Sequence, residues 1–353
     1  MPMHIKRLVL PGVCVSRSLP ENFDANDIEY FESELEVRLP NVYVISLENM
    51  CLTGDGLLFR GLNIMALTLP GAAAKSGYFT LKDRLKFYLI NFRRSLFARC
   101  LPDLDYLWIT DLWSFGYFHW MTEALPRLLV ANAAGFQGSL LLPSNLRSYS
   151  FVEASLNPLF SGKVVYTDKI NKCKRLSVPT PIAQSGIYNE GLMKSLRSIY
   201  FKASASFAER AILSDRIYIS RSKASKRRVL NEDELIPVLE RYGFQLVFME
   251  DHDFQSQVSI CQAAKFLISN HGGGLTNMLY MKEGSSVLEL RKSDDYHNNC
   301  YFALASAMGL KYFYQLCAAS LPTEDSHTAD VIVDSFALEA NICAMLSFEK
   351  SID

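Results

Sequence analysis

The chain has 353 residues, of which 49% are hydrophobic and 21% charged, and its formal net charge is −1. This length fits two domains of roughly 150 residues each. The near-zero charge excludes a global basic field for binding nucleic acid or an anionic membrane. No uncharged apolar stretch reaches the roughly 18 residues of a membrane-spanning helix. The N-terminal apolar run is a poor signal peptide because Pro11 and Gly12 break it.

Eight cysteines are scattered along the chain, and no two of them form a C-x-x-C pair. In a chain of this size that pattern predicts thiols in a reducing compartment rather than disulfides or a zinc site. The expected location is therefore the cytoplasm.

The first half of the chain is irregular but rich in short apolar runs. An acidic stretch, 21–36, precedes a predicted strand at 42–47. Further buried strands are expected at 106–110, 139–142 and 164–166, with helices near 118–134, 145–155 and 190–205. The last of these helices is long enough to lead the chain out of a first domain.

After residue 210 strands and helices alternate regularly, which predicts parallel pairing and a doubly wound, Rossmann-type sheet. Asn231 and Glu234 predict a capping box at the first helix of this half. Strands are expected at 217–220, 245–248, 266–269, 287–290 and 312–314. We therefore predict an α/β protein with a first α/β domain at 1–205, a Rossmann-type domain at 206–330, and a C-terminal helix within 331–353 that packs back on the first domain.

Ligands of such sheets sit beyond the carboxyl ends of the strands, so the segments that follow strands carry the functional expectations. The first is 270–277, Asn-His-Gly-Gly-Gly-Leu-Thr-Asn, which follows a strand and opens a helix. Its three glycines let backbone approach a ligand closely, and a helix N-terminus suits a phosphate. The plainer interpretation is a tight turn in which His271 satisfies a buried carbonyl, because isolated glycine motifs have high false-positive rates.

The second segment is 220–228, in which five of nine residues are basic. Guanidinium groups bind phosphate oxygens in bidentate fashion and can neutralise a departing diphosphate. The alternatives are a solvated basic loop or a nucleic-acid patch, and the absence of interleaved aromatic residues argues against nucleic acid.

The third segment, 113–127, is crowded with aromatic residues, which stack on sugars but also fill cores. His119, Glu123 and Arg127 are spaced to form one polar stripe on a helix, and a histidine or carboxylate is the group that takes a proton from an acceptor hydroxyl. The alternative is a Glu123–Arg127 ion pair. Pro126 implies a kink or a late helix start, because it has no N–H to donate.

The sequence patterns that could indicate a metal site are weaker than the three segments above. Asp251 and Asp253 follow a strand and could hold a divalent cation, but Asp253 is better interpreted as a helix N-cap. We expect a metal-free mechanism with no cofactor.

Together these segments resemble glycosyltransferase family 61, whose bacterial members are often labelled capsular polysaccharide biosynthesis proteins. The resemblance rests on 118–127 (FHWMTEALPR), 218–221 (YISR), 228–232 (RVLNE), 271–277 (HGGGLTN) and 287–290 (VLEL), in that order across about 105–292. One departure is Gly273, where the family usually shows Ala.

The resemblance implies a GT-B-like arrangement of two Rossmann-type domains facing each other across a cleft, with 1–205 as the acceptor-side domain and 206–330 as the nucleotide-sugar-binding domain. It also implies inverting, metal-independent transfer from a nucleotide sugar, expected to be UDP-linked, to a hydroxyl of a glycan acceptor in surface polysaccharide synthesis. The acceptor is expected to be a glycan or a lipid-linked glycan, with peripheral contact at the inner face of the membrane. The alternatives are a non-catalytic nucleotide- or glycan-binding scaffold and a metal-dependent transferase using Asp251 and Asp253.

The expected site residues fall into three groups. The catalytic pair is Glu123 and His119, and which of the two is the general base stays open. Acceptor contacts are expected from Trp113, Trp120 and Arg127. Donor contacts are expected from Arg221, Arg227, Arg228, His271, Gly272, Gly273, Gly274, Thr276, Asn277 and Glu289, the last toward ribose hydroxyls or, equally, as an ion-pair partner.

Overall fold

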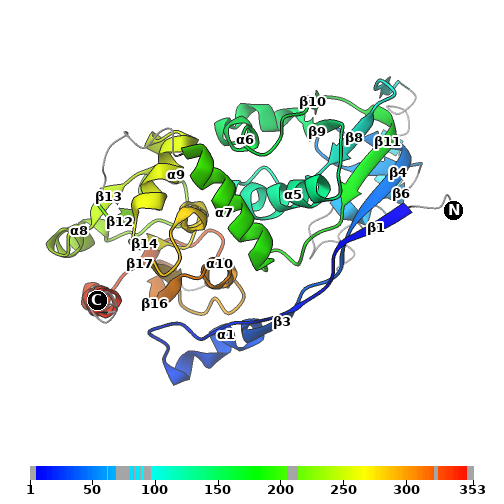
Figure 1. Ribbon diagram of the computed structural model, residues 1–353. Coiled ribbons are helices and arrows are strands. Elements are labelled where there is room, and N and C mark those ends of the chain that lie inside the picture. The colour runs from blue at the N-terminus through cyan, green and yellow to red at the C-terminus, as the bar shows by residue number, and fades with distance from the viewer. Residues whose placement is uncertain are drawn as a thin grey trace. The chain divides into compact units, whose positions relative to one another are not determined.

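The computed structural model describes residues 5–61, 63–68, 80, 82, 85–86, 89–90, 97–204, 214–321 and 325–347 (Figure 1). The chain divides into two compact units. Unit 1 comprises residues 1–13 and 38–185, and unit 2 comprises 14–37 and 186–353. Each unit is described by itself below.

Unit 1 is built on a mixed sheet. Its strands among the described residues are β1 (Ile5–Leu10), β4 (Val42–Leu52), β5 (Leu58–Arg60), β6 (Asn63–Ile64), β7 (Arg99–Cys100), β8 (Asp105–Trp108), β9 (Ser139–Pro143), β10 (Val164–Thr167) and β11 (Asn171–Pro179). The path β10-β9-β8-β11 is parallel, whereas β4 pairs antiparallel with β11, β1 and β5. The strands predicted at 42–47, 106–110, 139–142 and 164–166 are all present.

One long helical segment crosses unit 1 and packs on this sheet (Figure 1). It consists of α4 (Tyr117–His119), a π-helical piece η3 (Trp120–Ala124) and α5 (Leu125–Ala133). Leu125, Leu128 and Ala131 are fully buried, so its apolar face supplies the core. The helix therefore fixes the polar residues that it carries. The helices of the unit whose bounds lie within the described residues also include η2 (Ala66–Thr68), η4 (Ser144–Ser148) and α6 (Ser150–Leu156).

Unit 2 contains the predicted doubly wound sheet. Its strands are β12 (Arg216–Ile219), β13 (Gln245–Val247), β14 (Phe266–Asn270), β15 (Ser286–Lys292), β16 (Lys311–Ala319) and β17 (Val331–Ile332). The spatial order is β13-β12-β14-β15-β16-β17, parallel except for β17. The strand order reverses between β12 and β14, and this reversal is the switch point at which such sheets bind ligands.

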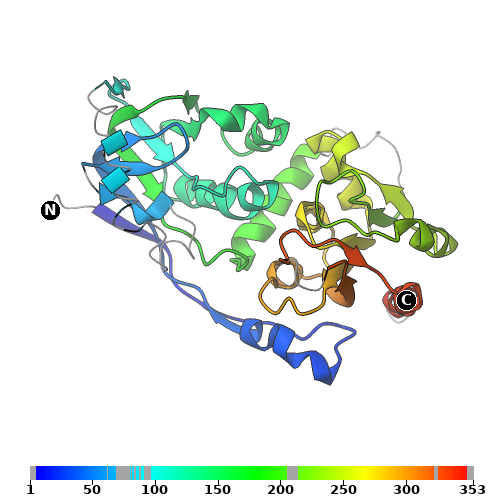
Figure 2. The same cartoon turned by 180° about the vertical axis from the view of Figure 1, so that it is seen from behind.

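Helices cover both faces of this sheet. One face carries α8 (Glu232–Arg241) and α11 (Ser335–Ser347), whose apolar side chains share a core with Ile268, Leu288 and Phe313. Among the described residues of 186–353, the unit also contains α7 (Glu190–Ser204), η6 (Met249–Asp251), α9 (Phe254–Ala263), η7 (Gly273–Tyr280) and α10 (Cys300–Met308). Of these, α7, α9, α10 and η7 contact one another. Both layers can be followed in Figure 2.

The division into units differs from the predicted boundaries in two places. Residues 14–37, with β2 (Cys14–Ser16), η1 (Ala25–Asp27), α1 (Ile28–Leu35) and β3 (Glu36–Arg38), belong largely to unit 2. The long helix α7 also belongs to unit 2 rather than to the first domain.

The C-terminal helix is present, but it packs within unit 2. Leu338, Ile342 and Met345 of α11 are fully buried in the core beside α8 and β16. The predicted capping box at α8 is not formed. Instead, the Asn231 side chain donates to Val333 O (2.8 Å) and accepts from Val333 N (3.0 Å), which ties the start of α8 to the segment before α11.

Candidate active site

An acid–histidine pair lies on the helical segment of unit 1. His119 Nδ1 is 2.8 Å from Glu123 Oε1, and Ser185 Oγ donates to the same oxygen at 2.6 Å. The two side chains are 24% and 15% exposed. Among the residues that the structure describes, none donates to Glu123 Oε2 and none pairs with His119 Nε2. The pair is thus oriented on one side and open on the other, which suits proton abstraction.

Trp113 lies against this pair. Its ring centroid is 5.1 Å from that of His119, and the side chain is 37% exposed. An exposed aromatic ring next to an acid–histidine pair is a suitable surface for a sugar. The predicted acceptor contact at Trp113 fits this position.

A buried ion pair holds the loop that carries Trp113. Arg127 Nη2 donates to Asp111 Oδ2 at 3.0 Å, and Arg127 Nη1 donates to Ile109 O at 3.1 Å. The other oxygen of Asp111 accepts from Trp113 N and Ser114 Oγ, both at 3.0 Å. Asp111 therefore organises the loop from the interior.

The other two predicted acceptor residues are interior side chains. Arg127 is 4% exposed, and it pairs with Asp111 rather than with Glu123. Trp120 is fully buried, and its Nε1 donates to Ser155 Oγ at 2.8 Å. The structure gives both residues a packing role and no surface for an acceptor.

In unit 2 the two predicted donor segments meet at the switch point. Arg221 follows β12, and Gly272 follows the adjacent β14. A Cβ built on Gly272 would lie 2.4 Å from Arg221 Nη1 and 2.6 Å from its Cζ, so only glycine leaves room for this guanidinium. The two sequence motifs therefore lie next to each other in space, as expected for segments that follow the carboxyl ends of two adjacent parallel strands.

Arg221 is held by backbone and is not neutralised. Its Nε donates to Arg227 O at 3.0 Å and its Nη2 to Lys226 O at 3.1 Å. Within the described part of the chain no carboxylate lies within 4.0 Å of it. Burial, and then the neighbouring charge of Arg227, lower the pKa of Arg221. A partly buried guanidinium without a counter-ion is a natural partner for an anion.

His271 begins the glycine turn and is linked to a buried acid. Its Nδ1 contacts Glu289 Oε1, and Tyr312 OH donates to Glu289 Oε2 at 2.6 Å. Glu289 is fully buried, so it lies out of reach of ribose hydroxyls. Of its two predicted roles, the structure shows the ion-pair partner.

The remaining predicted donor residues do not converge with Arg221. Arg228 turns to Asp330, with Nη2 to Oδ2 at 2.8 Å. Arg227 adopts a left-handed φ of 56°, and its carbonyl accepts from both Arg221 Nε and Asn270 Nδ2. Thr276 and Asn277 are buried in η7. The side chains of these residues therefore support the conformation of the turn and do not join the Arg221 guanidinium.

The other two glycines of the turn differ in their surroundings. A Cβ on Gly274 would lie 3.0 Å from Ile219 Cγ2, whereas one on Gly273 would meet nothing within 4 Å. Close packing thus explains Gly274, and an alanine fits at 273.

The acidic pair considered for a metal is already engaged. Asp253 caps α9 as predicted, accepting from Ser256 N at 2.7 Å. Asp251 binds Lys223 Nζ at 2.6 Å. Across the described ranges no group of three or more His, Cys, Asp or Glu side chains has the arrangement of a metal site.

Three contributors were missed by the sequence reasoning. Asp111 follows the carboxyl end of β8, so its position after a strand could have marked it as a candidate site residue. Tyr312 lies on the strand beside Glu289, and only the register Glu289↔Tyr314 of β15 and β16 brings it close. Ser185 is separated from Glu123 by 62 residues and carries no local signal.

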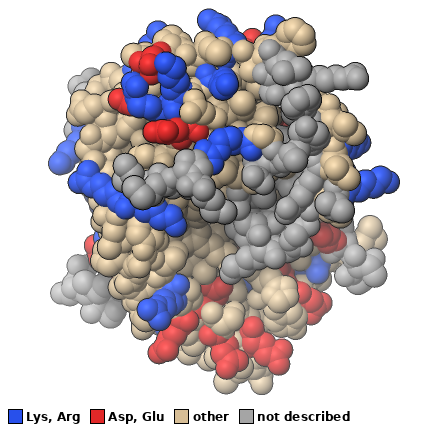
Figure 3. All heavy atoms as spheres, turned by 90° about the vertical axis from the view of Figure 1, so that its right-hand side faces the viewer, with Lys and Arg blue, Asp and Glu red and all other residues tan. Residues whose placement is uncertain are grey.

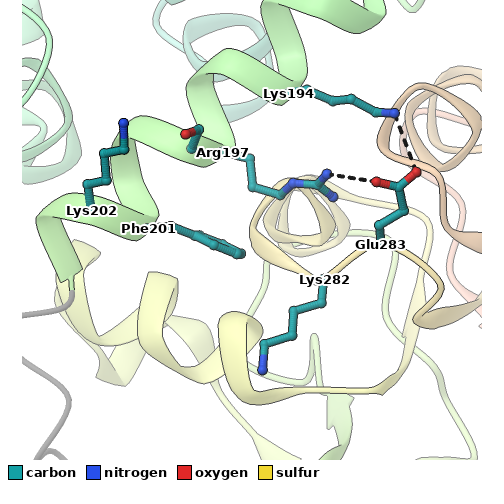
Figure 4. Close-up of a pocket in the computed structure, with 7 residues that line it drawn as sticks. Lys194, Arg197, Phe201, Lys202, Lys282 and Glu283 are labelled. Atoms are coloured by element: carbon teal, nitrogen blue, oxygen red, sulfur yellow. Dashed lines mark hydrogen bonds and ion pairs between the residues drawn. The ribbon is translucent and has the colours of Figure 1, made fainter.

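A hollow of about 590 Å³ opens on α7 and is a different place from the strand-end turn (Figure 4). Its lining combines α7 with the turn that precedes β15, that is, the amino end of that strand. Arg197 and Lys194 point to Glu283, at 3.6 and 3.5 Å, so their charges are partly satisfied within the hollow (Figure 4). It lies away from the carboxyl edge where Arg221 and Gly272 meet.

No helix of the described residues is both long and apolar enough to cross a bilayer. The family model of glycosyltransferase 61 matches residues 117–288, which include the acid–histidine pair, Arg221 and the glycine turn.

The chain is also similar to animal proteins named EGF domain-specific O-linked N-acetylglucosamine transferase. It is 39% identical over 98 residues to that of Drosophila melanogaster, covering 27% of this chain and 18% of the relative. It is 33% identical over 91 residues to that of Xenopus laevis (24% and 17%) and 29% over 102 residues to that of Mus musculus (28% and 19%). The matched stretch thus spans less than a fifth of each relative's length. None of these three carries a capsular-polysaccharide name. Residues 117–288, just under half of the chain, therefore match the glycosyltransferase 61 family model, and the similar animal proteins are named as transferases.

Proposed function

We propose that the protein transfers a sugar from a nucleotide sugar to an acceptor hydroxyl, with inversion and without a metal. The observation that carries this proposal is the guanidinium of Arg221, unpaired by any described carboxylate and lodged against Gly272 at the switch point of unit 2. A diphosphate bound there would meet the positive charge of Arg221 and the backbone of the glycine turn. In this GT-B-like proposal unit 2 holds the donor and unit 1 supplies the base.

The reaction is a single displacement at C1 of the donor sugar. The acceptor O–H gives its proton to the His119–Glu123 pair, the acceptor oxygen forms a bond to C1, and the bond from C1 to the diphosphate oxygen breaks. The electron pair leaves with the diphosphate, whose growing charge Arg221 stabilises. Because His119 Nδ1 is held by Glu123, we assign proton abstraction to His119 Nε2, with Glu123 orienting the ring.

This order within the pair is tested by His119→Ala and Glu123→Gln, assayed for turnover and for donor binding. We expect H119A to lose at least 100-fold in kcat, to bind donor normally and to be partly rescued by added imidazole. If H119A keeps most of its turnover while E123Q loses it, Glu123 is the base. If neither variant loses turnover, the pair is not catalytic.

The donor is tested by thermal shift against nucleotide sugars, starting with UDP-N-acetylglucosamine because the relatives are named as N-acetylglucosamine transferases. A ligand at 100 times its Kd adds about 2.7 kcal/mol to the free energy of unfolding. The matched control is Arg221→Met, which should lose the shift. No shift with any nucleotide sugar would exclude the donor assignment.

The acceptor is proposed to be a glycan hydroxyl in surface polysaccharide synthesis, at the cytoplasmic face of a membrane. Leu85, Leu89 and Phe97 are 54%, 68% and 89% exposed, and Lys82 and Lys86 of the same stretch of sequence are exposed too, which supports peripheral membrane contact. Figure 3 shows one face of the molecule, on which Lys and Arg side chains are scattered, and Asp and Glu side chains are visible both near the top and at the bottom of the view. Co-sedimentation with anionic vesicles tests the contact, and its absence argues for a soluble acceptor.

Two rivals make different predictions. A metal-dependent transferase using Asp251 and Asp253 would lose activity in excess chelator, whereas the proposed enzyme keeps it. A non-catalytic scaffold would bind nucleotide sugar but hydrolyse none of it, even over long incubation.

A further inference from the structure

The glycine turn of unit 2 is backed by a buried chain of polar groups. Tyr312 OH donates to Glu289 Oε2, and Glu289 Oε1 contacts His271 Nδ1. Glu289 is fully buried and the His271 side chain is 11% exposed. A buried carboxylate needs hydrogen bonds or a positive partner, and here it has a phenol on one oxygen and an imidazole on the other.

Several other groups surround this histidine. Its ring lies edge-on to Tyr301, with centroids 4.9 Å apart, and Tyr301 OH donates to Gly272 O at 2.6 Å. Burial alone would raise the pKa of Asp295, but a hydrogen bond from Asn298 and the charges of His271 and Arg291 hold that pKa below its usual value. The charged and titratable groups near the turn are Glu289 and Arg291 of β15, Asp295 of the following loop, Cys300 and Tyr301 of α10, Tyr312 of β16, and Arg221 and Arg227 of the basic loop.

The contact with Glu289 decides which ring nitrogen of His271 is available. Nδ1 is committed to the carboxylate, so Nε2, on the opposite side of the ring, is the remaining donor. Within the described part of the chain no residue pairs with Nε2. His271 immediately precedes Gly272, against which the guanidinium of Arg221 lies.

We propose that His271 binds the donor diphosphate as an imidazolium, with Nε2–H donating to a phosphate oxygen, and that Glu289 and Tyr312 are positioning residues for it. This inference rests on the proposed function, because it assumes that the diphosphate lies at the turn. The imidazolium adds a positive charge to the site, beside that of Arg221. Glu289 favours the charged ring, and Tyr312 keeps Glu289 in place.

The inference predicts that UDP affinity depends on the charge of His271. We would measure the Kd of UDP by calorimetry from pH 5.5 to 9 for the full chain and for His271→Gln, which keeps a donor without a titrating charge. UDP itself titrates identically in both series, so the ratio of the two Kd values isolates His271. At low pH we expect the wild type to bind UDP about tenfold or more tightly than H271Q does. At high pH we expect the ratio of the two Kd values to approach one.

Glu289→Gln and Tyr312→Phe separate positioning from simple packing. Removal of the carboxylate charge should move the midpoint of the pH dependence to lower pH. Y312F should move it in the same direction by less, while circular dichroism reports that the variant is folded. A purely structural role would weaken the fold without moving this midpoint.

The outcomes are distinct. Parallel Kd curves for wild type and H271Q overturn this inference and leave the donor site intact. If the wild type does not bind UDP at any pH tested, the donor assignment fails, and the inference fails with it. A midpoint that stays in place in both folded positioning variants excludes Glu289 and Tyr312 as positioning residues.

Discussion

The adjacent glycines 272 and 273 provide a matched test of the donor site. An alanine methyl at 272 would lie 2.4 Å from Arg221 Nη1, whereas one at 273 would meet no atom within 4 Å. Gly272 has φ 164° and ψ 175°, an extended conformation that alanine adopts without strain. Any effect of Gly272→Ala therefore comes from the displaced guanidinium.

The expected magnitude follows from the bonds of Arg221. The guanidinium ends a flexible side chain, so it can swing away and the fold survives. It then gives up its bonds to Arg227 O and Lys226 O. Hydrogen bonds from a charged donor are worth about 1.5–3 kcal/mol each when buried, and one of these two is exposed, so we expect a loss of about 2 kcal/mol in unfolding free energy. Loss of the same magnitude from diphosphate binding weakens UDP by roughly 10- to 100-fold.

Urea unfolding and calorimetric titration with UDP measure the two effects, with Gly273→Ala as the control that should change neither. If G272A binds UDP as tightly as G273A, the guanidinium contact is irrelevant to the ligand. If G273A loses binding equally, flexibility of the turn is what matters, and our reasoning from the Arg221 contact is wrong.

Three further predictions concern the framework of the two units. Asp111→Ala leaves the buried charge of Arg127 unpaired and should cost about 3–5 kcal/mol in urea unfolding, and a loss below 1 kcal/mol would contradict the burial of this pair. Burial raises the pKa of Cys173 to about 12, so at pH 8 only about one in 10⁴ of these thiols is ionised, and a thiol reagent should label the exposed Cys14 long before Cys173. Asp253→Ala removes the cap of α9 and should cost about 1 kcal/mol while leaving chelator-resistant turnover unchanged, and a selective loss of turnover would revive the metal hypothesis.

The strand-end features were predictable because they depend on local pattern. Regular alternation after residue 210 indicated a parallel sheet, and such a sheet brings the ends of neighbouring strands together. Arg221 and Gly272 are 51 positions apart in sequence, yet they meet because β12 pairs with β14. Neither motif was decisive alone.

The polar stripe on the helix of unit 1 was predicted only in part. His119 and Glu123 meet as a regular spacing of four predicts, but Arg127 does not join them. Glu123 itself lies in the π-helical piece η3, which ends at Ala124, and at its end Leu125 N donates to Trp120 O five residues back. One extra residue in a helical turn rotates the side chains that follow it by about 100° around the helix axis. This rotation moves Arg127 away from the stripe and toward the buried Asp111. Pro126 was the local warning, because it has no N–H for the α-helical bond to Thr122 O.

The assignment of residues 14–37 could not be predicted, because the reason lies in tertiary contacts. Asn299 Nδ2 donates to Tyr30 O at 2.6 Å, and Asp294 N donates to Tyr30 OH at 3.0 Å. Both partners are more than 260 positions away in sequence. The acidic composition of this stretch gave no indication of them.

The two acid–histidine pairs have the same chemistry and differ in burial, and this difference assigns their roles. A general base must return its proton to water after every turnover, which requires access to solvent. His119 and Glu123 are 24% and 15% exposed and have that access. Glu289 is fully buried and its two oxygens are bonded to His271 and Tyr312, so it has no direct contact with solvent. Such a carboxylate is suited to hold a positive charge in place while a diphosphate binds and leaves, and unsuited to exchange protons in each cycle. The difference in burial therefore supports the proposal that the exposed pair transfers the proton and the buried pair provides the fixed charge.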